Sequence, residues 1–202
     1  MNDNFNIDTL PIADEIKNNF ERIISLLGED TDREGLKKTP LRAAKAIKFL
    51  TEGYEMEPKQ ILQNAMFNED YNEMVIVKDI ELYSLCEHHM LPFFGKAHIA
   101  YISSGNVIGL SKMNRIVEYY AKRPQVQERL TKQIVKELQE ALGTDDVACV
   151  IDAKHLCVNS RGIKDVNSST VTSEFGGKFK YDSATKDEFL KYIQLDTSFN
   201  GI

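Results

Sequence analysis

The sequence predicts an α+β fold in which two long helices pack on one side of a mainly antiparallel sheet, preceded by an N-terminal helical segment. Apolar residues recur at helical spacing over the first fifty residues, β-prone segments begin at Met74, and a long helical stretch separates two groups of them. This order of helices, strands, long helices and strands is typical of the class. We predict a helical segment over 1–70 and an α+β domain over 71–202.

Two helices are predicted in the N-terminal segment. The first carries an apolar stripe at helical spacing and is followed by Gly28, which favours a helix end. The stripe consists of Ile16, Phe20, Ile23, Ile24 and Leu27. After a charged loop over 29–36, Thr39 and Pro40 predict the start of a second helix with Thr39 as its N-cap. That helix is expected to run toward Gly53.

Strands are predicted from Met74 onward. Residues 74–77 and 80–85 are β-prone, and 97–102 forms a third segment of this kind. A turn is predicted at 103–106, followed by a short strand over 107–110. Residues 147–158 give the clearest strand pattern in the chain.

Two long helices are predicted between these groups of strands. Ser111 is the expected cap of the first, which runs to about Lys122. Pro124 is expected to begin the second, whose apolar residues recur every four positions until Gly143. A short C-terminal helix is predicted over 189–193.

Composition excludes several classes of protein. The chain has 202 residues and a net charge of −6, from 25 Lys and Arg against 31 Asp and Glu, which argues against a nucleic-acid-binding surface. No apolar run approaches the ~20 residues of a membrane span, and residues 1–14 lack the pattern of a signal peptide. We therefore expect a cytoplasmic protein. Three cysteines are too few for a disulfide scaffold and favour metal binding or catalysis.

The segment 86–89, Cys-Glu-His-His, is the densest group of potential metal ligands. Cys86 and His89 are three residues apart, so one helical turn or a tight loop can direct both at one point. Far downstream, His155 and Cys157 are two apart, and on a strand they would project to the same side. Thiolates together with imidazoles are the ligands that zinc prefers.

Spacing alone leaves open which kind of zinc site this is. A closed structural site would use Cys86, one of the two adjacent histidines, His155 and Cys157. Three protein ligands and a water would instead make a catalytic site. Cys149 lies about 26 Å from Cys157 along an extended strand, which predicts a core residue. His98 has no partner nearby in sequence and is also predicted to be structural.

A second constellation begins at Gly109. Lys112 and Arg115 are three apart in the first turn of a predicted helix, where cations oppose the helix dipole unless an anion lies between them. Such a helix start can bind phosphate, although two solvated surface cations are an equally good interpretation.

Two further charged residues are candidates for a substrate site. Arg161 follows Cys157 by four residues and can reach the metal region, unless it simply faces solvent. Glu128 lies in the first turn of the helix predicted from Pro124, where a carboxylate favours the helix dipole. Its carboxylate can also accept two N–H bonds from a purine or pterin ring.

Several motifs occur in order over about residues 30–195. They are Arg33-Glu34-Gly35-Leu36 with Thr39-Pro40-x-Arg42, Cys86-Glu87-His88-His89, Gly109-Leu110-Ser111-Lys112-x-x-Arg115, Arg123-Pro124-Gln125-Val126-Gln127-Glu128-Arg129-Leu130, His155-x-Cys157, Arg161-Gly162 and Thr170-Val171-Thr172-Ser173. On these motifs the chain resembles the GTP cyclohydrolase I family, zinc enzymes that begin pterin and folate synthesis. No motif position departs from the family pattern.

The resemblance implies a metal site with three protein ligands and a water. The implied Zn²⁺ ligands are Cys86, His89 and Cys157. His155 would be the acid/base that protonates the imidazole ring of guanine, and His88 would orient water or the ribose.

The resemblance also implies the substrate, GTP, and the product. Lys112, Arg115 and Arg161 would bind the triphosphate, and Glu128 the guanine edge. Carbon C8 would leave as formate, and Ser111 would serve the later ring chemistry that gives 7,8-dihydroneopterin triphosphate.

The implied fold is the T-fold, in a catalytic domain over 71–202. Subunits would join edge to edge into five-membered rings that stack as a homodecamer, with sites between subunits. Ring closure would also pair the exposed sheet edges. No nucleic acid and no membrane is expected as a partner.

Two other hypotheses remain open at the level of sequence. The chain could be a binding module in which a structural zinc supports nucleotide sensing without turnover. It could also be a T-fold relative that acts on another purine or pterin through a cysteine nucleophile. The number of protein ligands on the metal distinguishes the first from an enzyme, and the presence of zinc distinguishes the second.

Overall fold

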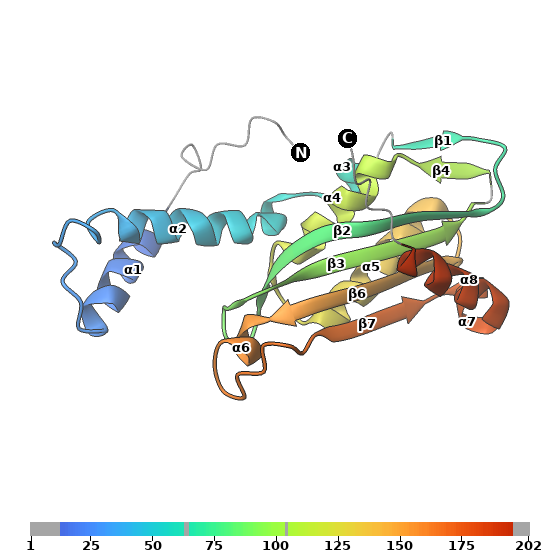
Figure 1. Cartoon of the computed structure of the whole chain (residues 1–202). Helices are drawn as coiled ribbons and strands as arrows, with labels where there is room; N and C mark the ends of the chain where they lie inside the picture. The colour runs from blue at the N-terminus through green and yellow to red at the C-terminus, as the bar shows by residue number, and fades with distance from the viewer. Residues whose placement is uncertain (1–12, 63–64, 104, 196–202) are drawn as a thin grey trace, which may run out of the picture. The chain divides into compact units, whose positions relative to one another are not determined.

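The computed structural model describes residues 13–62, 65–103 and 105–195, and the chain divides into two compact units, Met1–Glu52 and Gly53–Ile202 (Figure 1). The predicted domain boundary after residue 70 stays a prediction. No helix in the described part of the chain is long and apolar enough to cross a membrane.

The first unit contains α1 (Asp14–Leu26) and α2 (Thr39–Leu50). Helix α1 ends where the sequence predicts, and Gly28 follows in a left-handed conformation with φ of 88°. The predicted cap of α2 is wrong. The carbonyl of Lys38 already accepts the N–H of Arg42, so Lys38 is the N-cap and Thr39 is the first helical residue.

The second unit is built on a five-stranded sheet of order β5-β2-β3-β6-β7, in which only the β5–β2 pair is parallel. Its strands are β2 (Met74–Cys86), β3 (Pro92–Ile102), β5 (Pro124–Gln125), β6 (Val147–His155) and β7 (Thr170–Phe175). Strands β1 (Met66–Asn68) and β4 (Asn106–Ile108) form a separate antiparallel pair. The helices described in this unit are α3 (Pro58–Leu62), α4 (Leu110–Ala121), α5 (Gln127–Leu142), α6 (Leu156–Asn159), α7 (Gly177–Tyr181) and α8 (Ser183–Gln194). A 3₁₀ turn at Glu52–Glu55 includes the last residue of the first unit and the first of the second.

The two strands predicted over 74–77 and 80–85 are one strand with an irregularity. The β2–β3 register shifts between Val77 and Ile80, and Asp79 adopts a positive φ of 59° there. The Nδ1 atom of His98 accepts the N–H of Asp79 at 3.1 Å. His98 therefore has the structural role predicted for it.

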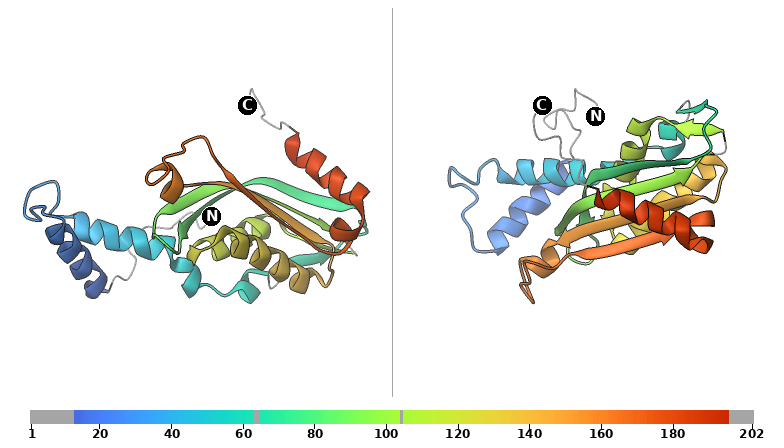
Figure 2. Two further views of the ribbon diagram at one scale, coloured as in Figure 1. Left: turned by 90° about the horizontal axis from the view of Figure 1, so that it is seen from below. Right: turned by 45° about the vertical axis from the view of Figure 1, so that its right-hand side comes forward.

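The two long helices α4 and α5 cover one face of the sheet, as predicted. Their apolar residues, such as Ile116, Leu130 and Ile134, join Ile99 and Ile151 of the strands in one buried cluster. The opposite face was not predicted to be covered, but α7 and α8 pack Phe179 and Phe189 on it. Figure 2 shows α8 (red) and α5 (yellow) on opposite sides of the sheet.

The starts of both long helices differ from the prediction. Gly109, not Ser111, is the N-cap of α4, and its carbonyl accepts the N–H of Lys112 at 2.8 Å. Residues Pro124–Gln125 form the short strand β5, with Cys86 opposite Gln125, so α5 begins only at Gln127. Gly143 ends α5 as predicted, with a left-handed φ of 65°. The parallel pairing with β2 fixes the start of α5 beside the end of β2.

Candidate metal and substrate site

Three potential ligand atoms, from Cys86, His89 and Cys157, lie within 4.8 Å of one another. Cys86 ends β2, and a tight turn follows in which its carbonyl accepts the N–H groups of His89 and Met90 at 3.2 and 2.8 Å. Met90 has a positive φ of 54°, which closes the turn. The turn brings the His89 ring to 3.6 Å from the Cys86 sulfur, measured at Nδ1.

Cys157 reaches this group from α6 and not from a strand. The predicted strand over 147–158 is too long, because β6 ends at His155 and the chain turns into the single helical turn of α6. The β3–β6 register places His155 opposite Phe93, at the end of β3 that follows the turn after Cys86. Figure 1 shows α6 at the same end of the sheet as the β2–β3 turn.

The donor set suits a thiophilic metal such as zinc. Two sulfurs bound at ~2.3 Å in a tetrahedral site lie ~3.8 Å apart, so donors already within 4.8 Å need only a small contraction. Burial raises the pKa of the Cys157 thiol, and the neighbouring Cys86 raises it further, while Arg161 opposes the change. Metal binding requires the thiolate, so a bound cation would reverse this preference.

We call Cys86, His89 and Cys157 the metal group. His155 lies near these three residues but is not one of them. Its Nε2 is 2.7 Å from Oε1 of Gln127, and its ring stacks on Phe93 with a centroid distance of 4.5 Å and an angle of 7°. Burial lowers the pKa of His155, and the nearby Glu128 carboxylate partly opposes this. A closed site with His155 as fourth ligand is therefore not the arrangement observed.

His88 is the second histidine of the turn. Its side chain is exposed, with Nδ1 at 3.9 Å from the Cys86 sulfur and Nε2 at 3.9 Å from the Glu87 carboxylate. It borders the metal group without belonging to it. Of the two adjacent histidines, His89 therefore belongs to the group of potential ligands and His88 does not.

Two of the predicted substrate-binding residues lie at this end of the sheet. Glu128 is in the first turn of α5, close enough to His155 to affect its pKa. Arg161 is exposed after α6, close enough to Cys157 to lower the pKa of its thiol.

The other predicted substrate residues do not come together with the metal group within one chain. Lys112, Arg115 and Ser111 belong to the start of α4. That start follows Ile108, whose N–H is bonded to the Tyr101 hydroxyl at 3.1 Å. Along β3, Tyr101 is eight residues from Phe93, about 26 Å away.

The cations at the start of α4 have no acidic partner in the described residues. Lys112 and Arg115 are half-buried, and no carboxylate within the described ranges forms an ion pair with either. Lys112 lies in the first turn of α4 and Arg115 in the second. Two cations at the start of a helix, without a neutralising carboxylate, favour binding of an external anion.

Cys149 is a core residue, as predicted. It is fully buried in the cluster between the sheet and the long helices, and burial raises the pKa of its thiol strongly. It takes no part in the metal group.

The sequence reasoning missed Gln127, a fully buried amide at the start of α5. Its Oε1 is the partner of His155, and its Nε2 lies within bonding distance of three oxygens on β6 and β7. The sequence does contain a signal for this residue. Gln127 and Thr131 are four residues apart, so their polar side chains lie on one helix face, next to the row of apolar residues that faces the core.

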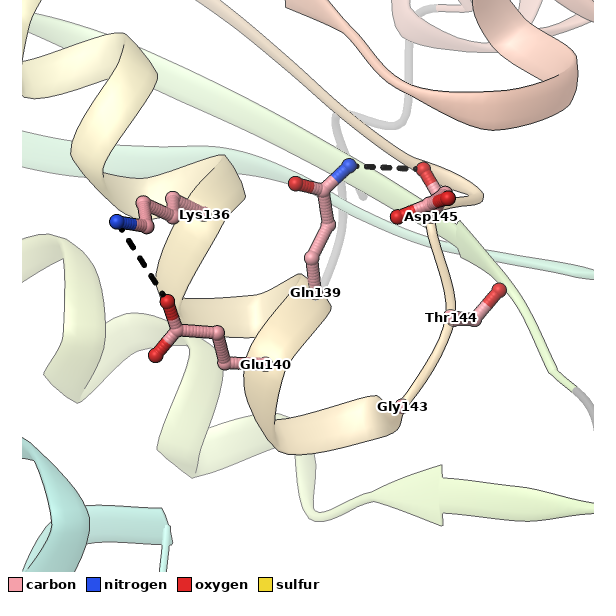
Figure 3. A pocket seen from close by; sticks show the side chains of 6 residues that line it. All are labelled: Lys136, Gln139, Glu140, Gly143, Thr144 and Asp145. Carbon is pink, nitrogen blue, oxygen red and sulfur yellow. Dashed lines mark hydrogen bonds and ion pairs between the residues drawn. The ribbon is translucent and has the colours of Figure 1, made fainter.

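A surface pocket of about 330 Å³ lies at the other end of α5 (Figure 3). Lys136, Gln139 and Glu140 of the helix and the loop 143–145 line it. Gln139 donates to the Asp145 carbonyl at 2.9 Å, and Lys136 pairs with Glu140 at 3.7 Å. These contacts satisfy the polar groups locally, and none of the residues of the metal group is part of the pocket.

Comparison with known proteins identifies the family. The model of the family described as GTP cyclohydrolase I matches residues 16–194. The chain belongs to the GTP cyclohydrolase I family. A GTP cyclohydrolase 1 of Flavobacterium johnsoniae is 61% identical over 198 residues, which cover 98% of this chain and 88% of the relative.

More distant GTP cyclohydrolases align over nearly the same length. A relative from Bacteroides fragilis is 52% identical over 91% of this chain and 94% of its own, and one from Porphyromonas gingivalis is 54% identical over 88% and 92%. The GTP cyclohydrolase I match contains the metal group, His155 and the start of α4. The mixed α/β architecture with an antiparallel-dominated sheet is compatible with the family fold.

Proposed function

We propose that this chain hydrolyses GTP, releases C8 as formate and forms 7,8-dihydroneopterin triphosphate, the first step of tetrahydrofolate and pterin biosynthesis. The observation that carries this proposal is the three-donor group Cys86, His89 and Cys157 with His155 held beside it, in a chain of this family. We also propose a cytoplasmic location.

Zinc is the proposed cofactor, bound by Cys86, His89 and Cys157. Bound there with one open position, Zn²⁺ supplies Lewis acidity that activates water at neutral pH. Three protein donors, with the fourth candidate His155 bonded to Gln127 instead, support an open catalytic site over a closed structural one.

His155 is the proposed acid/base. Its neighbours hold the ring in one orientation, and burial favours its neutral form, so it can accept a proton and return it to the imidazole ring of guanine. His88, exposed at the edge of the metal group, is proposed to orient water or the ribose.

Glu128 is proposed to bind the guanine edge. Its carboxylate is exposed in the first turn of α5, beside His155, and can accept two N–H bonds from the base. This position would set the distance between the base and the metal group.

The triphosphate is proposed to bind Lys112, Arg115 and Arg161, with Ser111 acting in the later ring chemistry. Arg161 is at the metal end of the sheet, whereas the other three lie at the start of α4. A complete site therefore requires the α4 start of a second copy. We propose a T-fold homo-oligomer with sites between subunits, a decamer of two five-membered rings.

Exposed apolar side chains at both ends of the sheet support contacts between subunits there. Met90 and Ile163 are exposed near the metal group, and Phe67 and Leu110 are exposed near the start of α4. A contact between the metal end of the sheet in one copy and the α4 end in a second copy is head-to-tail. Such contacts close into a ring when the rotation between neighbouring copies allows it.

The test is a GTP-to-formate assay on the purified full chain, with and without a chelator and after zinc is restored. We expect formate and a product that becomes fluorescent on oxidation, both lost with the chelator. No product from zinc-loaded protein would contradict the proposal. GTP binding without turnover would instead support the sensor hypothesis, and alkylation of a thiol by substrate without zinc would support the cysteine-nucleophile hypothesis.

A second measurement separates the two kinds of zinc site. His155→Ala is expected to keep one zinc per chain and to lose turnover, whereas Cys157→Ala is expected to lose both. Loss of zinc from His155→Ala would show that His155 is a ligand of a closed site.

A further inference from the structure

The buried amide of Gln127 lies where α5, β6 and β7 meet. Its Nε2 is 3.1 Å from the Ile151 carbonyl, 2.8 Å from the Thr170 carbonyl and 3.1 Å from the Thr172 hydroxyl. Its Oε1 is 2.7 Å from Nε2 of His155. Both ends of the amide are therefore occupied, with the side chain only 1% exposed.

These contacts allow only one orientation of the amide. Backbone carbonyls accept hydrogen bonds and cannot donate, so the NH₂ group must face Ile151 and Thr170. Rotating the amide by 180° would set its oxygen against two carbonyl oxygens in a buried site, which is strongly unfavourable. The oxygen of Gln127 therefore faces His155.

Two threonines reinforce this orientation. The Thr131 hydroxyl donates its single proton to the backbone carbonyl of Gln127 at 2.8 Å, so it has no proton left to donate elsewhere. The Thr172 hydroxyl, 2.6 Å from that of Thr131, must then be the donor between them. The Thr172 oxygen keeps its lone pairs for the Gln127 NH₂ group.

The same logic assigns the proton of His155. An amide oxygen only accepts, so Nε2 of His155 must carry a hydrogen, and in the neutral ring Nδ1 is then unprotonated. Nδ1 forms no hydrogen bond with the described residues and is not among their buried unpartnered atoms, so it is open to solvent. Stacking on Phe93 restrains the ring plane.

We propose that Gln127, held by Thr131 and Thr172, is a positioning residue that keeps the proton of neutral His155 on Nε2 and presents Nδ1 to the substrate. This inference rests on the proposed role of His155 as acid/base. In this arrangement Nδ1 is the ring nitrogen left as a hydrogen-bond acceptor, while Nε2–H stays bonded to Gln127. Thr172 links this function to β7, the strand at the edge of the sheet.

Substitutions that keep shape test the proposal. Gln127→Met removes the acceptor, and Thr172→Val removes one hydroxyl of the network. Thr170→Val is the matched control, because Thr170 is an exposed threonine on the same strand that contributes only its backbone carbonyl. Zinc content and thermal unfolding are measured on each variant, so that only folded, metal-loaded protein enters the kinetic comparison.

We expect Gln127→Met to lower the single-turnover rate of formate release by roughly 10- to 100-fold at saturating GTP, with KM and zinc content little changed. Thr172→Val should lower it less, and Thr170→Val should leave it unchanged. In a His155→Ala background, Gln127→Met should have no further effect, since it acts through His155.

The outcomes separate this inference from the proposed function. If His155→Ala lowers the rate but Gln127→Met lowers it by the same factor in both backgrounds, the positioning role is wrong and the acid/base role stands. If His155→Ala has the wild-type rate, the proposed role of His155 fails first, and the inference with it.

A spectroscopic measurement applies even where residual turnover is too slow to follow. ¹⁵N spectra of histidine-labelled holoenzyme, assigned with His155→Ala, should show neutral His155 protonated at Nε2. Gln127→Met should give a mixture of both tautomers. A wild-type signal protonated at Nδ1, or an unchanged tautomer in Gln127→Met, would overturn the inference.

Discussion

The guanidinium of Arg129 forms two hydrogen bonds with the carboxylate of Glu87, at 2.5 and 3.1 Å. Glu87 lies in the turn that carries two of the three potential metal ligands, and Arg129 lies in the first turn of α5. The Glu87 N–H also donates to the Gln125 carbonyl at 3.0 Å. The turn after Cys86 and the start of α5 are therefore joined by both side-chain and backbone hydrogen bonds.

Breaking this pair should weaken metal binding without preventing folding. Glu87→Gln and Arg129→Gln loosen the turn that orients Cys86 and His89, so we expect zinc to dissociate faster by roughly tenfold or less. The measurement is the rate of zinc transfer to a chromogenic chelator. Glu140→Gln breaks the exposed Lys136–Glu140 pair on the same helix and serves as control. Equal rates in all variants would show that the pair does not support the site.

The cap of α8 should make stability depend on pH. Bonds from the Thr185 hydroxyl, and then from backbone N–H groups, lower the pKa of Asp182 below its ordinary value of 3.8. Because the folded pKa is the lower one, the carboxylate stabilises the fold fully above the unfolded value and loses this contribution as pH falls through the folded value.

Asp182→Ala should therefore lower the melting temperature most at neutral pH, and the difference from wild type should shrink below pH 3.8. Thermal unfolding across this range checks it. Asp187→Ala is the control, since Asp187 is exposed on the same helix and makes no capping bond in the described structure. A difference that stays constant with pH would contradict the assigned pKa shift.

Gly95→Ala should destabilise the sheet where β3 pairs closely with β6. A Cβ atom at Gly95 would lie 2.0 Å from the Asp152 carbonyl oxygen and 2.6 Å from the Ala153 Cα, both of which are backbone atoms. We expect a loss of at least about 1–3 kcal/mol in the free energy of unfolding, measured in urea.

Gly109→Ala is the control for this prediction. Its φ of −59° suits alanine, and the nearest atom to an added Cβ is 3.6 Å away. The comparison concerns stability alone. Similar unfolding free energies for the two variants would show that β3 and β6 separate at little cost.

Cys149→Ala should leave the metal site intact. The residue is buried in the core and outside the metal group, so we expect one zinc per chain and a loss of about 1 kcal/mol in stability. Metal analysis and urea unfolding measure the two effects. A lower zinc content than in wild type would contradict the assignment of Cys149 to the core.

Local sequence patterns predicted the long helices and most strands because their determinants lie within a few residues. Helix α5 is the clearest case, since its apolar spacing and Gly143 specify its length and its end. The end of β6 was not predictable in this way. Nothing in the pattern around Leu156 marks the turn into α6, and the turn depends on how that end packs against β3.

Strand β7 was missed for a related reason. As an edge strand it is largely exposed and lacks the alternation of buried and exposed residues that identifies a strand. The contacts of Gln127 with β6 and β7 depend on that same strand, so they were invisible to local reasoning. Residue type indicated a possible metal site at Cys86, His89 and Cys157, because thiols and imidazoles are the ligands that zinc prefers. Which of the two adjacent histidines joins the group depends on the turn after β2, which residue type does not reveal.

The separation between the start of α4 and the metal group also has a genetic consequence. A chain altered at Cys157 keeps an intact Lys112, and a chain altered at Lys112 keeps an intact Cys157. In the proposed oligomer with sites between subunits, each variant alone would build only defective sites. Co-assembly of the two variants would bring one intact half from each chain to the same interface, so two inactive alleles would complement each other, whereas two substitutions in the metal group would not.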